Sequence, residues 1–110
     1  MAIRLTKPWQ SLSDEAIRGL PGQLGVFELA DDAGRVLYVG YAGGRSLFGL
    51  RSAVERARVA MPDARRFRCE VTIQYLTRHQ ELLMLHVADH GAMPEGNRSE
   101  PLRLGKLSPL

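Results

Sequence analysis

Two apolar runs separated by an acidic turn lie in the first half of the chain, and together they predict a β-hairpin. Residues 24–30 and 36–41 are rich in the β-branched and aromatic side chains that favour extended strands. The linking stretch DDAGR supplies aspartate and glycine, which are typical of tight turns. We therefore expect the two runs to pair as antiparallel neighbours.

Two longer segments place apolar residues at the spacing of an α-helix. Within residues 47–61, one helical face would carry Leu50, Ala53, Val54, Ala57 and Met61. Thr77 can cap a second helix that runs to about residue 90. Gly91 then stands where a left-handed helix cap is expected.

The stretch RFRCEVTIQYL, between the two helices, alternates well enough to form a third strand. One side of it would carry Phe67, Cys69, Val71 and Ile73. Before the hairpin, Ser11 or Ser13 can cap a short helix that ends at about Gly19. The expected fold class is α+β: a three-stranded antiparallel sheet with the order β-β-α-β-α and a short N-terminal helix. We expect residues 1–110 to form a single domain, in which residues 98–110 are a tail.

Composition narrows the class of protein. A chain of 110 residues can bury one core without disulfides. The single cysteine, Cys69, excludes both a disulfide framework and a cysteine-based zinc site, and it favours a reducing, cytoplasmic setting. No segment approaches the run of about 18 apolar residues that crosses a membrane, and the N-terminus lacks the apolar stretch of a signal peptide. We therefore expect a protein that is not exported and has no membrane partner.

Arginine is concentrated in the middle of the chain, although the net charge is only +3. The arginines of this segment are Arg51, Arg56, Arg58, Arg65, Arg66 and Arg68. Only Glu55 and Asp63 oppose them locally, so a polyanion such as nucleic acid is the expected partner. The alternative is that these side chains simply form a solvated charged face.

The hairpin and the residues after it resemble the GIY-YIG nuclease superfamily over residues 20–97. Gly25-Val26-Phe27 corresponds to the first half-motif and Tyr38-Val39-Gly40 to the second. Three later residues stand at positions of the family's helical arginine, its metal-binding glutamate and its asparagine after a proline: Arg51, Glu81 and Asn97. The order of elements expected above is also the order of that family's domain.

The match to the family pattern has three differences. Phe27 stands where the first half-motif has tyrosine, so one hydroxyl is missing. Glu55 follows Arg51 by one turn, where the family commonly has histidine or tyrosine. The loop between Gly40 and Arg51 and the segment after Glu81 are also longer than usual.

The resemblance implies a metal-dependent endonuclease that hydrolyses phosphodiester bonds in nucleic acid, with DNA as the expected substrate. Glu81 would bind Mg²⁺ or Mn²⁺, hard cations that need few protein carboxylates. Arg51 would hold the scissile phosphate by a forked contact, and Tyr38 would accept or relay a proton. The candidate nucleic-acid contacts are Tyr41, Arg45, Arg56, Arg58, Arg65, Arg66 and Asn97.

Each of these side chains also has a plainer interpretation. Glu81 can be a helix-start glutamate favoured by the helix dipole, and Arg51 can pair with Glu55 at i,i+4. Tyr38 can be a packing aromatic at a strand end. Asn97 can bond backbone amides and order the tail instead of touching a substrate. The motif glycines can serve backbone freedom or close approach in a hairpin.

The histidines form a rival constellation. His79, His86 and His90 fall close to one stripe of the second helix, and the last two have the i,i+4 spacing that can bind Zn²⁺ or Ni²⁺. A complete site would need ligands from elsewhere in the chain. Two further classes therefore stand beside the nuclease: a catalytically inactive nucleic-acid-binding module on the same scaffold, and a protein-interaction or small-molecule domain. A homodimer or a partner protein is compatible with each.

Overall fold

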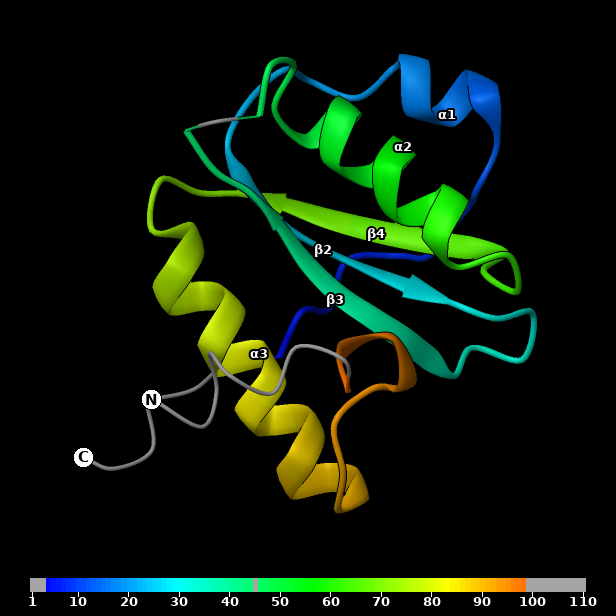
Figure 1. The fold of residues 1–110 in the computed structure, drawn as a ribbon, viewed down its shortest axis with the longest axis vertical. Helices are drawn as coiled ribbons and strands as arrows, with labels where there is room; N and C mark the ends of the chain where they lie inside the picture. Colours follow the sequence, from blue (N-terminus) through cyan, green and yellow to red (C-terminus); the bar gives the residue numbers. More distant parts are fainter. Residues whose placement is uncertain (1–3, 45, 99–110) are drawn as a thin grey trace.

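A four-stranded antiparallel sheet with three α-helices makes up the fold in the computed structural model, which describes residues 4–44 and 46–98 (Figure 1). In chain order the elements are β1 (Gln10–Ser11), α1 (Asp14–Arg18), β2 (Gly25–Ala30), β3 (Val36–Ala42), α2 (Leu50–Ala60), β4 (Arg66–Val71), α3 (Tyr75–His90) and the 3₁₀-helix η1 (Glu95–Asn97). The prediction of an α+β fold around an antiparallel sheet is confirmed. No helix in the described part of the chain is long and apolar enough to cross a membrane.

The prediction of three strands was wrong, because the chain before α1 adds a fourth. The strands are ordered β1-β4-β2-β3, and β1 pairs Gln10 with Phe67 and Ser11 with Arg66 at one edge. Two residues are too few to show the alternation that predicts a strand. This strand forms because the chain passes along β4, so nothing local could have predicted it.

The predicted hairpin is present as β2 and β3. Asp31 closes its turn, because Oδ1 accepts hydrogen bonds from the backbone nitrogens of Ala33 at 3.0 Å and Arg35 at 2.9 Å. Gly34 takes a positive φ of 89°, which a residue with a side chain would strain to adopt. Every residue of β2 is buried, because β3 lies on one side of it and β4 on the other.

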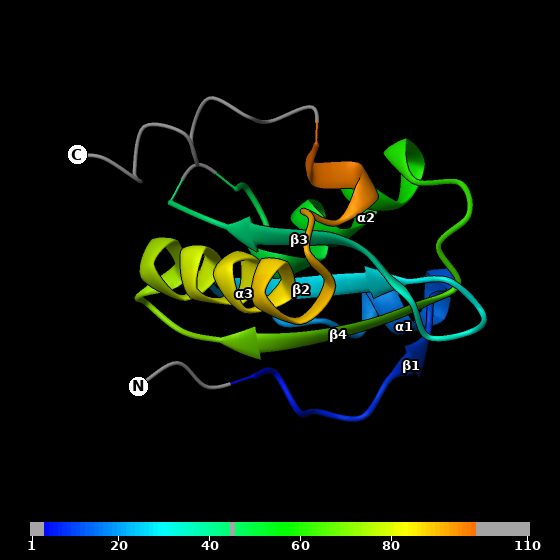
Figure 2. The same cartoon turned by 90° about the horizontal axis from the view of Figure 1, so that it is seen from below.

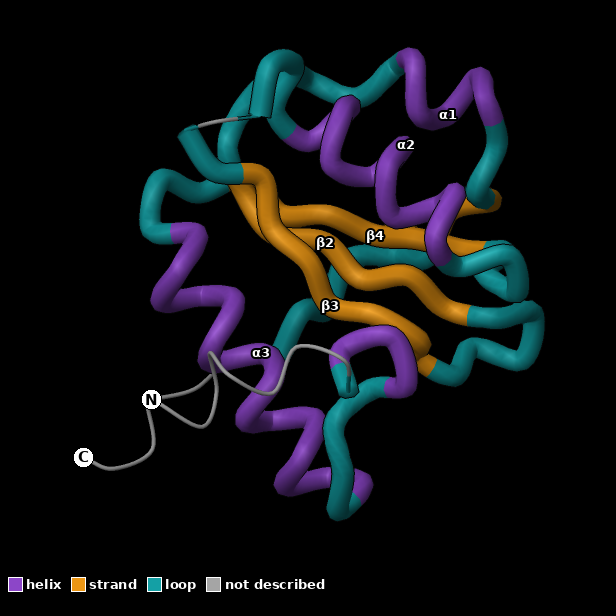
Figure 3. Tube along the Cα trace, in the orientation of Figure 1, coloured by secondary structure: helices purple, strands orange, loops and turns teal. Residues whose placement is uncertain are grey.

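Helices cover both faces of the sheet (Figure 2). In Figure 3, α1 and α2 lie on one side and α3 on the other. Alternation along the strands sends Phe27, Leu29 and Phe67 into the core under α1 and α2. Val26 and Val39 point the opposite way, into the second core with α3 and Leu5.

The helix ends agree with the sequence at Ser13, Gly19 and Gly91 and differ at Thr77. Ser13 is the N-cap of α1, and its Oγ accepts a hydrogen bond from the backbone nitrogen of Ala16 at 3.1 Å. Gly91 ends α3 in the left-handed conformation, as predicted. The Thr77 cap was wrong: α3 begins at Tyr75, so Thr77 already lies in its first turn.

The third predicted strand is shorter than expected. β4 ends at Val71, which is 49% exposed, and Ile73 beyond it is 83% exposed. Phe67 and Cys69 do pack on the core under α2. The placement of Ile73 on that inward side was therefore wrong, because the strand ends before it, and Val71, the last residue of the strand, is only half covered.

Candidate functional site

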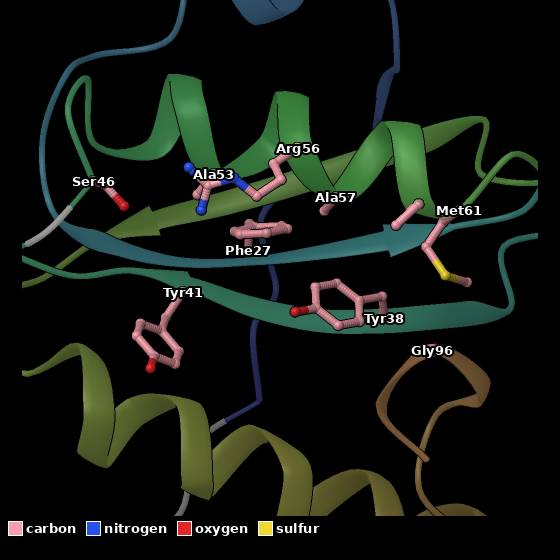
Figure 4. A pocket seen from close by; sticks show the side chains of 10 residues that line it. Phe27, Tyr38, Tyr41, Ser46, Ala53, Arg56, Ala57, Met61 and Gly96 are labelled. Atoms are coloured by element: carbon pink, nitrogen blue, oxygen red, sulfur yellow. The ribbon is translucent and has the colours of Figure 1, made fainter. Parts of the chain in front are cut away.

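A cavity of about 300 Å³ lies between α2 and the edge strand β3 (Figure 4). Strand β3 contributes Tyr38 and Tyr41 to its wall, and α2 contributes Arg56 among small alanine side chains. Phe27 lies behind these residues, and Gly96 of η1 lines the opposite end. The alanines leave the space open, and the polar atoms are supplied by a few longer side chains.

Arg56, and not Arg51, is the α2 arginine that lines this cavity. The two residues are five positions apart, which places them about 140° apart around a helix. Arg51 therefore points toward the chain after α1, where Nε and Nη2 donate hydrogen bonds to the carbonyl oxygen of Leu20 at 3.3 and 3.2 Å. Its guanidinium also lies 6.0 Å from the ring centre of Phe48. The alternative pairing of Arg51 with Glu55 does not occur among the described contacts.

Much of the arginine cluster is neutralised by acidic residues from other elements. Arg58 Nη1 lies 2.5 Å from Asp14 Oδ1, and Arg68 Nε lies 2.8 Å from Glu28 Oε1. Arg66 is 3.9 Å from Asp32, and Arg65 donates to backbone carbonyl oxygens.

Arg56 differs from these arginines. It makes no hydrogen bond or ion pair with any residue in the described parts of the chain. Among the described residues, therefore, the Arg56 guanidinium has no counter-ion, and it lines the cavity.

Tyr38 brings a hydroxyl to the same cavity, and Figure 4 shows this oxygen directed toward the space in front of Phe27. The two rings are tilted by 51° with their centres 6.0 Å apart. Phe27 is 1% exposed, so it supports the wall without offering surface to a ligand. A methyl group on Gly40 would overlap the rings of both residues, so this glycine serves close approach.

Tyr41 joins the cavity to the aromatic cluster under α3. Its ring stacks on Tyr75 at 5.6 Å and meets the edge of His79 at 4.9 Å. His79 is buried, with Nε2 3.1 Å from the carbonyl oxygen of Val39. Tyr41 is therefore held from behind, with part of its surface left on the cavity side.

Asn97 is fully buried, and its side-chain amide binds the backbone of β3. Oδ1 accepts a hydrogen bond from the nitrogen of Val39 at 2.9 Å, and Nδ2 donates to the oxygen of Val39 at 2.9 Å. This geometry favours the interpretation in which Asn97 bonds backbone groups over direct contact with nucleic acid. Arg45, another candidate contact, lies outside the described residues.

Glu81 lies on α3, on the far side of the sheet from α2 (Figure 1). Its Oε1 is 2.5 Å from Nη1 of Arg78, whose Nε and Nη2 bind the carboxylate of Glu70 at 2.9 and 3.1 Å. The hydrogen bonds that Arg78 donates to Glu70, and then to Glu81, raise the pKa of Arg78, so this arginine stays charged. The structure thus brings Tyr38 together with Arg56, and it holds Glu81 elsewhere, in an ion-pair network.

The side chains around Glu81 do not fit Mg²⁺ in this arrangement. Its carboxylate already binds a guanidinium, which would repel a divalent cation placed beside it. Within residues 4–44 and 46–98, no group of three histidine, cysteine, aspartate or glutamate side chains could hold a metal ion.

Sequence reasoning missed two parts of the cavity. Ser46 lines it from the loop before α2, and no motif marks this serine. Gly96 also lines the cavity. This position needs a glycine, because a Cβ atom on it would lie 2.8 Å from the sulfur of Met61 and 2.9 Å from the carbonyl oxygen of Leu37. A glycine between Pro94 and Asn97 was the available signal for this close packing.

Comparison with known proteins identifies a family without assigning an activity. No curated protein and no solved structure shows a significant match to this chain. A domain family of unknown function (DUF7508) matches residues 3–89, which include all the strands, α1, α2 and all of α3 except its last residue, His90. The chain therefore belongs to the DUF7508 family.

Proposed function

We propose that the protein binds the phosphate backbone of nucleic acid in the cavity between α2 and β3, as a binding module on a GIY-YIG-like scaffold. The observation that carries this proposal is the guanidinium of Arg56, which has no partner among the described residues and faces a cavity. A guanidinium binds phosphate through two parallel hydrogen bonds, which makes this contact both strong and directional.

The rest of the cavity suits the same ligand. The hydroxyls of Tyr38 and Ser46 are further donors for phosphate oxygens. No aspartate or glutamate lines the cavity among the described residues, so nothing there would repel an anion. The chain order β2-β3-α2-β4-α3 supports the scaffold assignment, because it repeats the order that the resemblance implies. DNA is the proposed polymer, and the free thiol of Cys69 supports a reducing, cytoplasmic setting.

The test is a comparison of two arginine substitutions that remove the same charge from the same helix. Arg56→Gln removes the cavity guanidinium, while Arg58→Gln removes one that pairs with Asp14 on the other flank. Binding of fluorescently labelled single- and double-stranded oligonucleotides is measured by anisotropy at several salt concentrations.

We expect Arg56→Gln to weaken binding by about 10- to 100-fold, the usual value of hydrogen bonds to a charged group. The slope of log K against log salt should also fall by about 0.9 on duplex DNA, because one phosphate contact is lost. Arg58→Gln should change both quantities little. Equal losses in the two variants would show that only net charge matters, and unchanged binding in Arg56→Gln would refute the site.

Cleavage of the bound strand is the second candidate, favoured by the Tyr38 hydroxyl that shares the cavity with Arg56. In that case Glu81 would have to leave Arg78 to hold Mg²⁺ or Mn²⁺. The assay is nicking of supercoiled plasmid and of branched DNA with either metal, with EDTA and Glu81→Gln as controls.

Nicking that is lost in both controls would support the nuclease. Binding without nicking would leave only the first proposal. Folded protein with neither activity would favour the protein-interaction or small-molecule class.

A further inference from the structure

Two histidines lie side by side on the last turns of α3, away from the cavity described above. The ring centres of His86 and His90 are 4.4 Å apart, and the rings are tilted by 36°. Neither imidazole makes a hydrogen bond or ion pair with a residue in the described parts of the chain. His79, on the same helix, is buried and has the Val39 carbonyl oxygen 3.1 Å away.

The distance between the two rings fits chelation of one metal ion. A metal–imidazole bond is about 2.0–2.1 Å long, which puts the metal roughly 3.2 Å from each ring centre. Two such rings at a right angle around the metal have centres about 4.5 Å apart, whereas a tetrahedral angle separates them by about 5.2 Å. The observed 4.4 Å matches the right angle of square-planar and octahedral ions.

The surroundings leave both the imidazoles and the remaining metal positions available. Cavities of about 390 and 280 Å³ adjoin the pair, and both histidines line each of them.

Charged groups lie around the pair on both sides. In the larger cavity these are Arg4, Glu28, Arg68 and Asp89. In the smaller cavity they are Arg35, Glu95 and Arg98. The two acidic residues of the larger cavity are already bound to its arginines, which leaves the imidazoles as the free donors.

We propose that His86 and His90 form a bidentate site for a divalent transition metal that prefers right-angled nitrogen donors, Ni²⁺ or Cu²⁺. Water or a small ligand in the adjoining cavities would complete the coordination. The described residues contain no group of three histidine, cysteine, aspartate or glutamate side chains that could hold the ion together. This site does not depend on the nucleic-acid proposal, because it shares no residue with the cavity of Arg56.

The test uses the full chain without an affinity tag, titrated with Ni²⁺ alone by calorimetry. We expect one ion per chain, and an affinity that falls as the pH is lowered, because protons compete with the metal for the same nitrogens. His86→Gln and His90→Gln should each weaken binding at least about tenfold, because the second imidazole acts as an intramolecular ligand at high effective concentration.

A matched control moves one histidine without changing their number. In the double variant His90→Gln/Ala88→His, the two imidazoles are two positions apart, about 200° around the helix, and cannot share an ion. Position 88 is exposed, so the change should leave the circular dichroism spectrum and the fold intact. The double variant should bind Ni²⁺ as weakly as His90→Gln. Affinity equal to that of the unmodified chain in either variant would overturn the proposal.

Discussion

The side chain of Asn97 is expected to hold the edge of the sheet, and its replacement tests that role quantitatively. Its amide completes the outer side of β3 as a neighbouring strand would, with one bond accepted from Val39 and one donated to it. Asn97→Ala removes both bonds. The carbonyl oxygen of Val39 keeps His79 as a neighbour at 3.1 Å, but its backbone nitrogen loses the partner that the amide supplied.

The expected loss of stability can be worked out from these two hydrogen bonds. Leaving one buried donor unpaired costs about 1–3 kcal/mol, and the second, partly compensated bond contributes about 1 kcal/mol more. The free energy of unfolding should therefore fall by about 2–4 kcal/mol. Because 1 kcal/mol corresponds to about 4–8 °C in a domain of this size, the Tm should fall by roughly 8–32 °C. Urea unfolding followed by circular dichroism measures the first quantity, with the slope m expected to stay constant.

Asn97→Asp is the sharper control, since it keeps the shape and the acceptor. Its second oxygen would face the carbonyl oxygen of Val39, where the amide now donates a hydrogen bond. At neutral pH this variant should be at least as unstable as Asn97→Ala, and it should regain stability as acid protonates the buried carboxyl. Near-native stability of Asn97→Asp at neutral pH would refute the reasoning, as would a loss below about 0.5 kcal/mol in Asn97→Ala.

Three further tests address other parts of the fold: the glycines of the hairpin, the thiol of Cys69 and the buried carboxylate of Glu28. Gly25→Ala should lower the free energy of unfolding in urea by roughly 3 kcal/mol, and Gly40→Ala by roughly 2 kcal/mol. The methyl group at position 25 would meet the backbone of β4, whereas the one at position 40 would meet aromatic side chains that can shift. Equal losses in the two variants would contradict this. Burial raises the pKa of the Cys69 thiol to about 11, so the native protein should react with a thiol reagent far more slowly than the urea-unfolded chain, and equal rates would contradict the burial. Burial also raises the pKa of Glu28 more than Arg68 lowers it, so the unmodified protein should lose stability as the pH rises from the ordinary glutamate pKa to the raised one. Arg68→Met leaves that carboxylate without its partner and should cost about 1–2 kcal/mol more near pH 8 than near pH 5, where protonation relieves it; a cost independent of pH would show that Glu28 is not the cause.

Features of the fold that depend on neighbouring residues along the chain could be predicted from the sequence. The hairpin follows from two apolar runs and a turn whose aspartate bonds its own backbone. The left-handed cap at Gly91 follows from the same local chemistry. β1 could not be predicted, because its two residues form a strand only when β4 lies beside them.

The candidate site depended on contacts between distant parts of the chain, and here the sequence was less informative. Both Arg51 and Arg56 lie on α2, and only the packing of that helix determines which of them faces the cavity. The arginines form a basic cluster along the sequence, but in the folded protein Arg58 is paired with Asp14, 44 positions away. Ion pairs of this kind cannot be counted before the tertiary structure is known.

The hydrogen bonds between η1 and β3 also bear on how the chain behaves beside other copies of itself. A strand at the edge of a sheet offers unpaired backbone groups on which another chain can add a strand, the first step of ordered aggregation. At Val39, in the middle of β3, both of those groups are already bound within the same chain. A substitution in η1 that removes these bonds is therefore expected to expose unpaired backbone groups at the edge of β3 and also to destabilise the domain. Unfolding and self-association would then begin at the same place.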